Sequence, residues 1–566
     1  MKRKIIVILS VILSVCVFMF TMTACGSKES SHTDGLTFQL INNNSEYEVI
    51  GYKGTSAEVS IGSTYNGKPV TSIGDCAFRN CDWITSVIIP DSITHIGEYA
   101  FGEYEYNECP SLIYNIKDGL KYLGSRNNPY LFLAGPVNLE KETATIEDSC
   151  KIIGSFAFDG AYLTNVTIGE NITSISKGAF RGCSLLTSVT MGNNIKSIGN
   201  DAFSGCRSLT NVDIPNSVKS IGYTAFLGCS SLESITIPKN IIRIENRTFY
   251  GCRNLSEVVI PESVTSIGEK AFENCSKITK VNYLGTIDQW AQIEFSSNPL
   301  IYAQKLYIKD EVVSEAVLTT TSKISDYAFE FCRSLKRVVL GNSVKIIGCG
   351  AFSFCDSLTN VTVSDSLTSI GTMAFYGCDL LTNLVIPDSV VNIGTGTFVG
   401  CNSLNYTVKG GIKYFGSISN PYLFCVSATS TDIIKATIDE NCKFIGDNAF
   451  EYCRYLEEVS IPSGIVSIGH SAFYNCNALD DITLSDELTF IGESAFYQCT
   501  SLHEIIIPSS VRYIGYEAFR GCNSLVIYCK ASSEPTEWNT HWNKLGKDYD
   551  YYVPVVWGYT ANNPNG

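Results

Sequence analysis

Short bursts of alternating apolar and polar residues recur along this chain. Val212 and Ile214 stand two residues apart with polar residues between and beside them, which is the periodicity of a β-strand. Pro215 ends that strand, because proline has no N–H to donate and a fixed φ. Ile221 then returns to the interior, and Phe226 begins the next unit. The pattern therefore predicts one strand and one return segment in each unit.

The unit recurs along most of the chain, usually at an interval of 23 residues. Its phenylalanines are Phe78, Phe101, Phe158, Phe180, Phe203, Phe226, Phe249, Phe272, Phe329, Phe352, Phe375, Phe398, Phe450, Phe473, Phe496 and Phe519. A period of this length predicts a solenoid in which each coil packs only on its neighbours. Equivalent strands then lie side by side, so we expect a parallel sheet, with a short helical turn after each Ala-Phe pair.

Three parts of the unit resemble the BspA-like class of leucine-rich repeats found in bacterial surface proteins. They are the V-x-I-P strand, the S-V-x-S-I-G return and the A-F-x-G-C turn, as in 212–229, and the resemblance covers about residues 36–559. It implies a mainly β solenoid, a leucine-rich repeat right-handed superhelix of 23-residue coils. It also implies a non-enzymatic surface lipoprotein that adheres to host matrix, host cells or other bacteria.

The N-terminus is predicted to direct export. Lys2, Arg3 and Lys4 precede an apolar run over 5–20, and Cys25 follows Thr-Ala. This arrangement resembles the lipobox of bacterial lipoproteins, which implies that Cys25 carries the lipid. The alternative is an uncleaved anchor helix, although the run is short for a membrane span. We therefore expect a lipid-anchored, extracellular protein on the bacterial cell surface, with a membrane contact through the lipid.

The sequence divides into further predicted segments. They are a signal peptide (1–25), a flexible tether (26–35), an N-terminal cap (36–70), the coils (71–530) and an aromatic C-terminal cap and tail (531–566). Inserts interrupt the coils near 102–140, 280–315 and 403–430. The first and third resemble each other (G-L-K-Y-L-G-S and G-I-K-Y-F-G-S), so each is expected to hold one coil plus an excursion. In the second, Ile287, Trp290 and Ala291 predict a short amphipathic helix on the solenoid flank.

The 23 cysteines would ordinarily indicate disulfides in an exported protein. Fourteen of them, however, lie three residues after a repeat phenylalanine. Equivalent side chains in stacked coils point the same way, so their Cβ vectors do not converge as a disulfide requires. We expect structural thiols, with some disulfides as the alternative. No C-x-x-C pair occurs, so no metal site is predicted.

Composition narrows the possible functions. The formal charge of −15 is spread along the chain, which disfavours nucleic acid as a partner because phosphate binding needs a basic surface. The chain contains neither a G-x-S-x-G elbow nor a phosphate-binding glycine loop. We therefore predict no catalytic residue and no cofactor, and leave an enzyme hidden in the inserts as the alternative.

The outward positions of the V-x-I strands form the predicted binding face, because the core leaves them free to vary. These residues are Ser188, Thr190, Asn211, Asp213, Ser234, Thr236, Asn360, Thr362, Asp481 and Thr483. The expected partners are protein or glycan ligands on host cells or other bacteria. The alternative is a carbohydrate-capturing lipoprotein that uses the insert loops or an aromatic platform of Trp538, Trp542 and Trp557. The simpler interpretation of these tryptophans is a cap over the last coil.

Overall fold

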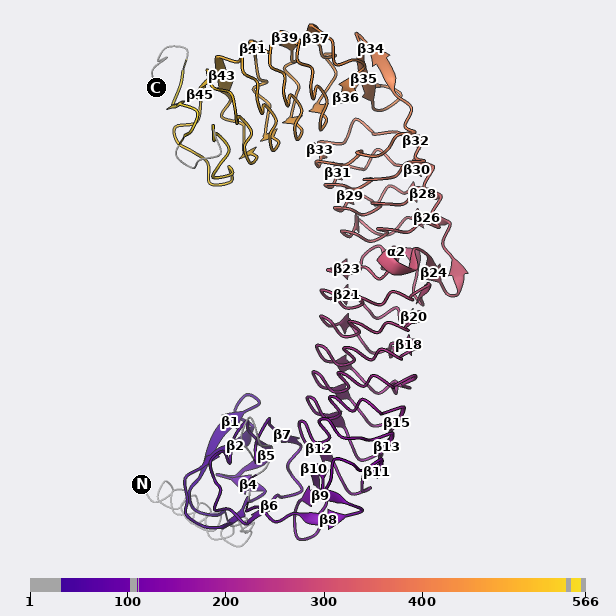
Figure 1. The fold of residues 1–566 in the computed structure, drawn as a ribbon, viewed down its shortest axis with the longest axis vertical. Helices are drawn as coiled ribbons and strands as arrows, with labels where there is room; N and C mark the ends of the chain where they lie inside the picture. Colours follow the sequence, from indigo (N-terminus) through magenta and orange to yellow (C-terminus); the bar gives the residue numbers. More distant parts are fainter. Residues whose placement is uncertain (1–31, 102–108, 110, 546–550, 561–566) are drawn as a thin grey trace, which may run out of the picture. The chain divides into compact units, whose positions relative to one another are not determined.

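The computed structural model of this protein describes residues 32–101, 109, 111–545 and 551–560 (Figure 1). The chain is a β-solenoid of about 21 turns, built from coils of roughly 23 residues with parallel stacked strands and almost no helix. The predicted fold class is confirmed. The two described helices are four residues long, and in the described part of the chain no helix is long and apolar enough to cross a membrane.

The coils fall into two compact units. Unit 1 consists of Met1–Ile241, Glu245–Leu255 and Glu273–Cys275, and unit 2 consists of Ile242–Ile244, Ser256–Phe272 and Ser276–Gly566. The repeat pattern crosses from one unit to the next without a break in sequence. The same coil construction recurs in both units.

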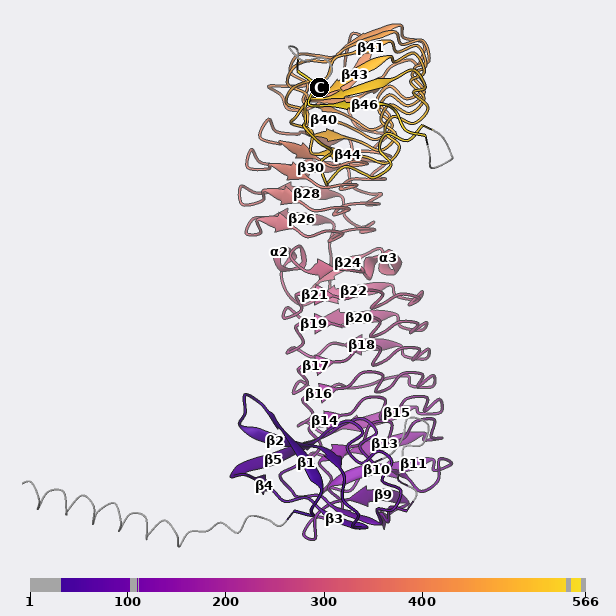
Figure 2. The same cartoon turned by 90° about the vertical axis from the view of Figure 1, so that its left-hand side faces the viewer.

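The coils of unit 1 carry two parallel ladders of short strands (Figure 2). The V-x-I ladder contains β11 (Thr143–Thr145), β13 (Asn165–Ile168) and β15 (Ser188–Met191). The return ladder contains β14 (Ser174–Ile175), β16 (Ser197–Ile198) and β17 (Ser220–Ile221). The return segments, which the sequence predicts only as a return to the core, are thus strands in their own right.

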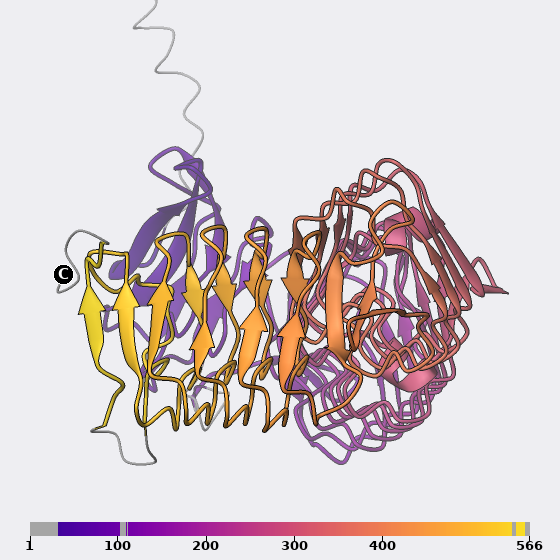
Figure 3. The same cartoon turned by 90° about the horizontal axis from the view of Figure 1, so that it is seen from above.

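Unit 2 repeats both ladders. Its V-x-I strands include β26 (Glu315–Leu318), β28 (Arg337–Leu340), β30 (Asn360–Thr362) and β32 (Asn383–Leu384). Beside them run β27 (Lys323–Ile324), β29 (Ile346–Ile347), β31 (Ser369–Ile370) and β33 (Asn392–Ile393). Figure 3 shows the strands of the last coils, in orange to yellow, lying side by side. Their return strands are β38 (Phe444–Ile445), β40 (Ser467–Ile468), β42 (Phe490–Ile491) and β44 (Tyr513–Ile514).

The turn that carries the Ala-Phe pair is not helical, so the expected short helical turn is wrong. Around Phe203 the backbone enters the left-handed region at Asp201 (φ 55°) and Gly205 (φ 76°). The amide of Phe203 donates to the carbonyl of Ala225 at 2.8 Å, one coil further on. An α-helix would instead bond each amide to the carbonyl four residues back. Other amides of the turn bond three residues back, as Ser204 does to the carbonyl of Asp201 at 3.0 Å, so the turn both closes on itself and joins the next coil.

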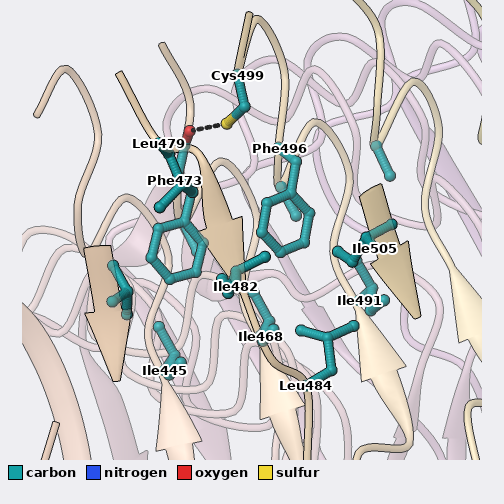
Figure 4. Packing of buried hydrophobic residues seen from close by; sticks show 14 of the residues in the cluster. Ile445, Ile468, Phe473, Leu479, Ile482, Leu484, Ile491, Phe496, Cys499 and Ile505 are labelled. Carbon is teal, nitrogen blue, oxygen red and sulfur yellow. Dashed lines mark hydrogen bonds between the residues drawn. The ribbon is translucent and has the colours of Figure 1, made fainter. Parts of the chain in front are cut away.

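A stack of phenylalanine rings fills the core. The ring centroid of Phe203 lies 5.2 Å from that of Phe180 and 5.3 Å from that of Phe226, with nearly parallel planes, and all three side chains are fully buried. Figure 4 shows the same arrangement in unit 2, where Phe473 and Phe496 are 5.3 Å apart. Leucine and isoleucine side chains from both ladders close around the rings.

The repeat cysteines hydrogen-bond to the backbone of the core. The Sγ atom of Cys229 donates to the carbonyl of Phe203 at 3.2 Å, and Cys499 does the same to Phe473 (Figure 4). Equivalent bonds are made by Cys183, Cys206, Cys252, Cys275, Cys355, Cys378, Cys401, Cys476 and Cys522. Burial raises the pKa of the Cys229 thiol to about 12, so it stays protonated and able to donate.

Alkylation of the folded protein is therefore expected to modify almost none of its cysteines. The described residues contain 21 free cysteines, and all except the half-buried Cys76 and Cys349 are buried. Because the thiolate is the reactive form, iodoacetamide at pH 8 should modify at most those two in the folded protein. Denaturation without reductant should expose all 21 to labelling, as read by intact mass. Labelling of only a few after denaturation would mean that disulfides hold the coils.

The first and third inserts each contain a three-stranded antiparallel sheet. The first contains β8 (Asn115–Lys117), β9 (Leu120–Leu123) and β10 (Phe132–Pro136). The third contains β34 (Thr407–Lys409), β35 (Ile412–Phe415) and β36 (Phe424–Ala428). In each, the last strand pairs in parallel with the next return strand, β12 (Ile152–Ile153) or β38. Each insert therefore joins the return ladder.

These two inserts also share side-chain contacts. In the first, Lys117 pairs with Glu147 at 2.6 Å, and the Tyr122 hydroxyl accepts from the backbone amide of Glu147. In the third, Lys409 pairs with Asp439 at 2.5 Å, and the Tyr414 hydroxyl accepts from the amide of Asp439. The two inserts, which are similar in sequence, thus also make equivalent side-chain contacts.

The second insert contains the predicted helix, α2 (Ile287–Trp290), started by a capping box of Thr286 and Gln289. Trp290 is fully buried, and its indole N–H donates to the carbonyl of Ala328 at 2.8 Å. A second helix, α3 (Leu300–Ala303), and a hairpin of β24 (Leu306–Ile308) and β25 (Glu311–Val312) follow. The helix is confirmed, and Trp290 and Ala291 are buried as its predicted apolar face requires.

The N-terminal segment of unit 1 has its own sheet. In it β1 (Leu36–Ile41) pairs antiparallel with β2 (Glu46–Tyr52), which pairs in parallel with β5 (Lys68–Ile73). His32 donates from Nε2 to the carbonyl of Thr64 at 2.6 Å and accepts at Nδ1 from the Gly62 amide. Residues 32–35, the last of the predicted tether, thus already pack on this sheet.

Candidate ligand-binding groove

The return ladder of unit 1 presents a column of hydroxyl groups. In β14, β16 and β17 the isoleucine points into the core and is buried, so the serine before it points outward. The Oγ atoms of Ser174 and Ser197 lie 2.8 Å apart and share a hydrogen bond. Ser220 continues the column and is exposed. The S-I dipeptide of the repeat therefore places equivalent hydroxyls on successive coils.

Glycine lets neighbouring coils approach closely beside this column. A Cβ atom on Gly222 would lie 2.5 Å from the backbone nitrogen of Asn200, and one on Gly199 would lie 2.7 Å from that of Lys177. Real Cβ atoms do not come so close, so only glycine fits at these two positions. The side chain of Asn200 in turn accepts from the amide of Tyr223 at 3.0 Å. The floor beside the serines is thus bare backbone.

Charged side chains close one end of the column. Lys177 donates to Glu98 at 2.9 Å, and this hydrogen bond raises the pKa of the Lys177 ammonium group. Both side chains are about one-third exposed, so a ligand can reach them. Asp75 accepts from the backbone amide of Glu98 at 2.7 Å and fixes its position. Exposed His95 from β7 (His95–Ile96) stands next to this pair in the chain.

Together these residues line a groove of about 620 Å³ in unit 1. Serines, glycines and isoleucines of several coils line it, together with Asn200, Tyr223 and charged side chains that include Asp75, Glu245 and the Lys177–Glu98 pair. A groove of this size is typical of ligand sites. The partner of the Ser174 hydroxyl is another hydroxyl, which does not activate it as a nucleophile in the way a base does. The arrangement is suited to recognition through hydrogen bonds.

The predicted binding face lies on the other ladder. Ser188, Thr190, Asn211, Asp213, Ser234, Thr236, Thr362, Asp481 and Thr483 are exposed, whereas Asn360 is half-buried. Some of these side chains hydrogen-bond within the ladder, as Ser188 does to Asn165 and Thr362 to Asn360. In unit 2, Asp481 and Thr483 border a hollow of about 230 Å³ beside an ion pair between Asp486 and Lys530. The face is accessible, but the larger groove was missed.

A recurring signal could have indicated the groove. Ser174, Ser197 and Ser220 stand at the same place in the S-I-G return, and a residue before a buried isoleucine in a strand must point outward. The return segment is predicted only to bring the chain back to the core, so its outward serines are not among the predicted binding residues.

The burial of two of the three tail tryptophans favours the cap over the alternative of an aromatic platform. Trp538 and Trp542 are 4% and 2% exposed, and their rings meet edge to face at 4.9 Å. Trp542 packs against Phe519 and donates to Glu534 at 2.8 Å. Trp557 is half-buried, with its ring 5.8 Å from that of Trp538. Indoles that cover the last coil cannot offer their faces to a sugar.

The remaining predictions concern the lipid anchor, metal ligands and catalytic residues. Cys25 and the predicted signal peptide lie outside the described residues. Among the residues that the structure describes, no three His, Cys, Asp or Glu side chains gather as metal ligands would. The absence of a catalytic residue and of a cofactor stays a prediction.

The chain matches a model of a leucine-rich repeat family. The family described as "BspA type Leucine rich repeat region (6 copies)" matches residues 55–126, 137–196, 173–302, 322–420 and 422–540. These segments include most of the chain. No curated protein matches the sequence.

Several solved bacterial structures are similar. A leucine-rich repeat protein from Bacteroides ovatus is 23% identical, with 73% of this chain and 98% of that chain covered and a TM-score of 0.31. A leucine rich cell surface protein from Faecalibacterium prausnitzii is 22% identical, with 93% and 100% covered and a TM-score of 0.23. The pneumococcal vaccine antigen PcpA is 16% identical, with 79% and 99% covered and a TM-score of 0.37.

Proposed function

Because this chain belongs to the family of BspA-type leucine-rich repeat proteins, we propose that it is a bacterial cell-surface binding scaffold that adheres to proteins of host cells or of other bacteria. In this proposal Cys25 carries a lipid that holds the protein on the membrane, and the ligand lies in the groove of unit 1. The proposal for Cys25 rests on the charged, apolar and small residues of 1–25. Loss of radiolabelled palmitate incorporation in Cys25→Ser would support it, and retention would contradict it.

The groove is the observation that carries this proposal. It is preformed, because the glycine contacts of neighbouring coils and the Asp75–Glu98 bond fix its walls before any ligand arrives. Preformed sites lose little conformational entropy on binding. Its hydroxyl and amide groups suit the main-chain and polar side-chain groups of an extended polypeptide, and Lys177 and Glu98 add a charged end that fixes its direction.

Filling the groove is expected to abolish adhesion without unfolding the protein. Bacteria that display the full-length chain would be tested on epithelial monolayers and on immobilised matrix proteins. Arginine at Ser197 and Ser220 projects outward into the groove, so Ser197→Arg/Ser220→Arg should reduce the number of attached cells about tenfold or more. Ser369→Arg is the matched control, because Ser369 holds the same place in β31 of unit 2. Equal losses in both variants, or no attachment by the unaltered protein, would overturn the proposal.

A further inference from the structure

A second hollow lies in unit 1 on the side of the Ala-Phe turns. It has a volume of about 450 Å³ and is bordered by Arg207, Arg253, Ser230, Tyr250 and Asn274. Arg207, Ser230 and Arg253 each follow a repeat cysteine, so they hold the same place in three successive coils. Ser230 Oγ donates to the backbone carbonyl of Arg207 at 3.3 Å and leaves the guanidinium group untouched. The two arginines thus flank a small hydroxyl.

Both guanidinium groups lack a carboxylate partner. Arg207 and Arg253 are exposed, and within the residues the structure describes neither forms an ion pair. In unit 2 an arginine at the equivalent position does form an ion pair. There Arg333 follows its repeat cysteine, and Asp356, one coil further on, binds it at 2.8 Å. In unit 1 the place of Asp356 is taken by Ser230. One coil beyond Arg253 the same place is taken by Ser276, so the sequence puts no acid at the place of Asp356 for either arginine.

The floor of the hollow is bare backbone. Gly228 (φ 71°) and Gly251 (φ 74°) adopt the left-handed conformation, and a Cβ on Gly251 would meet nothing nearer than Gly228 at 3.9 Å. The room is therefore open rather than filled by neighbours. Backbone without side chains lets a ligand approach closely. Tyr250 and Asn274 supply an aromatic ring and an amide at the edges.

We propose that this hollow binds an acidic polysaccharide, with one anionic group on each arginine. Coils of a parallel ladder are about 4.8 Å apart, so arginines two coils apart are separated by roughly 10 Å. That spacing suits successive charged sugars of a chain better than a single phosphate or carboxylate, which could reach only one guanidinium. Arginine binds sulfate and carboxylate groups through paired N–H donors. Ser230, Asn274 and the open glycine floor accommodate the hydroxyl-rich rings between the charges. The groove described above plays no part in this site.

The test is binding of heparin and hyaluronate oligosaccharides to the full-length protein at low ionic strength, measured by calorimetry. Heparin carries sulfates and carboxylates, whereas hyaluronate carries only carboxylates, so the two probes separate the anion types. Because a charge-assisted contact is worth about tenfold in affinity, Arg207→Ser/Arg253→Ser should weaken binding at least thirtyfold. Salt at 0.5 M should also weaken binding, since the contacts are exposed.

Two further variants make the result specific. Ser230→Asp recreates the pairing of unit 2 and should weaken binding about tenfold while leaving both arginines in place. Arg333→Ser removes the same charge from the paired place in unit 2 and should change affinity less than twofold. Thermal melting by circular dichroism would verify that all variants fold. The proposal is overturned if neither probe binds, or if Arg333→Ser weakens binding as much as the double variant. Full binding by Ser230→Asp would overturn it as well.

Discussion

Replacing Phe203 by alanine is expected to lower the free energy of unfolding of unit 1 by about 3–5 kcal/mol. The ring is fully buried, and it stacks on Phe180 on one side and Phe226 on the other, so its loss leaves a cavity bounded by two rings that cannot both move in. Urea unfolding followed by circular dichroism gives the magnitude. Hydrogen exchange locates it, because only the coils next to the cavity should lose protection.

Phe331→Ala is the matched control for that experiment. Phe331 also stacks on a phenylalanine one coil away, Phe354, at 4.8 Å, but it is half-buried and lies outside the core column. Its removal should therefore cost clearly less than the removal of Phe203. Equal effects would mean that stacking, rather than burial, determines the contribution of the rings.

Trp542→Ala is expected to have an effect of similar size at the other end of the chain, about 3–5 kcal/mol. The indole is buried, covers Phe519 of the last repeat and holds Glu534 through its N–H. Terminal coils of a solenoid have a neighbour on one side only and depend on such a cover. Hydrogen exchange should show early opening of the coils that end in β42 and β44.

Trp83→Ala tests whether that loss comes from burial. Trp83 is 44% exposed, so the same chemical change there should alter stability by about 0.5 kcal/mol or less. A Trp542→Ala protein with unchanged stability would instead free this residue for a role in binding, and would revive the sugar-capturing alternative.

Periodicity made the fold predictable because every coil repeats the same inward residues. Val212, Ile221 and Phe226 are buried as their spacing requires. The return strands were missed because two residues are too few to display alternation. The turn was predicted as helical because a left-handed residue is usually recognised in a sequence by glycine. Asp201 and Thr224 adopt this conformation without being glycine. The antiparallel inserts depend on pairing between strands, which their sequences alone do not show.

The candidate sites were less predictable for a different reason. A groove depends on which residues of separate coils become neighbours, and Glu98 and Lys177 are 79 positions apart in the chain. The hollow near Ser230 depends on which charges are left unpaired, and that requires knowing that Asp356 reaches Arg333. For the tail tryptophans the sequence favoured a cap and left a platform as the alternative, and the burial of Trp538 and Trp542 supports the cap.

The bonding of each turn to the next coil also bears on how such a protein changes through evolution. The amide of Phe203 bonds to Ala225 and that of Phe180 to Ala202, so every coil meets its neighbours through equivalent atoms. A coil gained or lost by recombination would leave those bonds in register. The paired inserts, with the same lysine, acid and tyrosine contacts, fit the copying of one longer block. The length of the solenoid can therefore change by whole coils. Its binding properties would then depend on the residues that differ between equivalent positions of those coils.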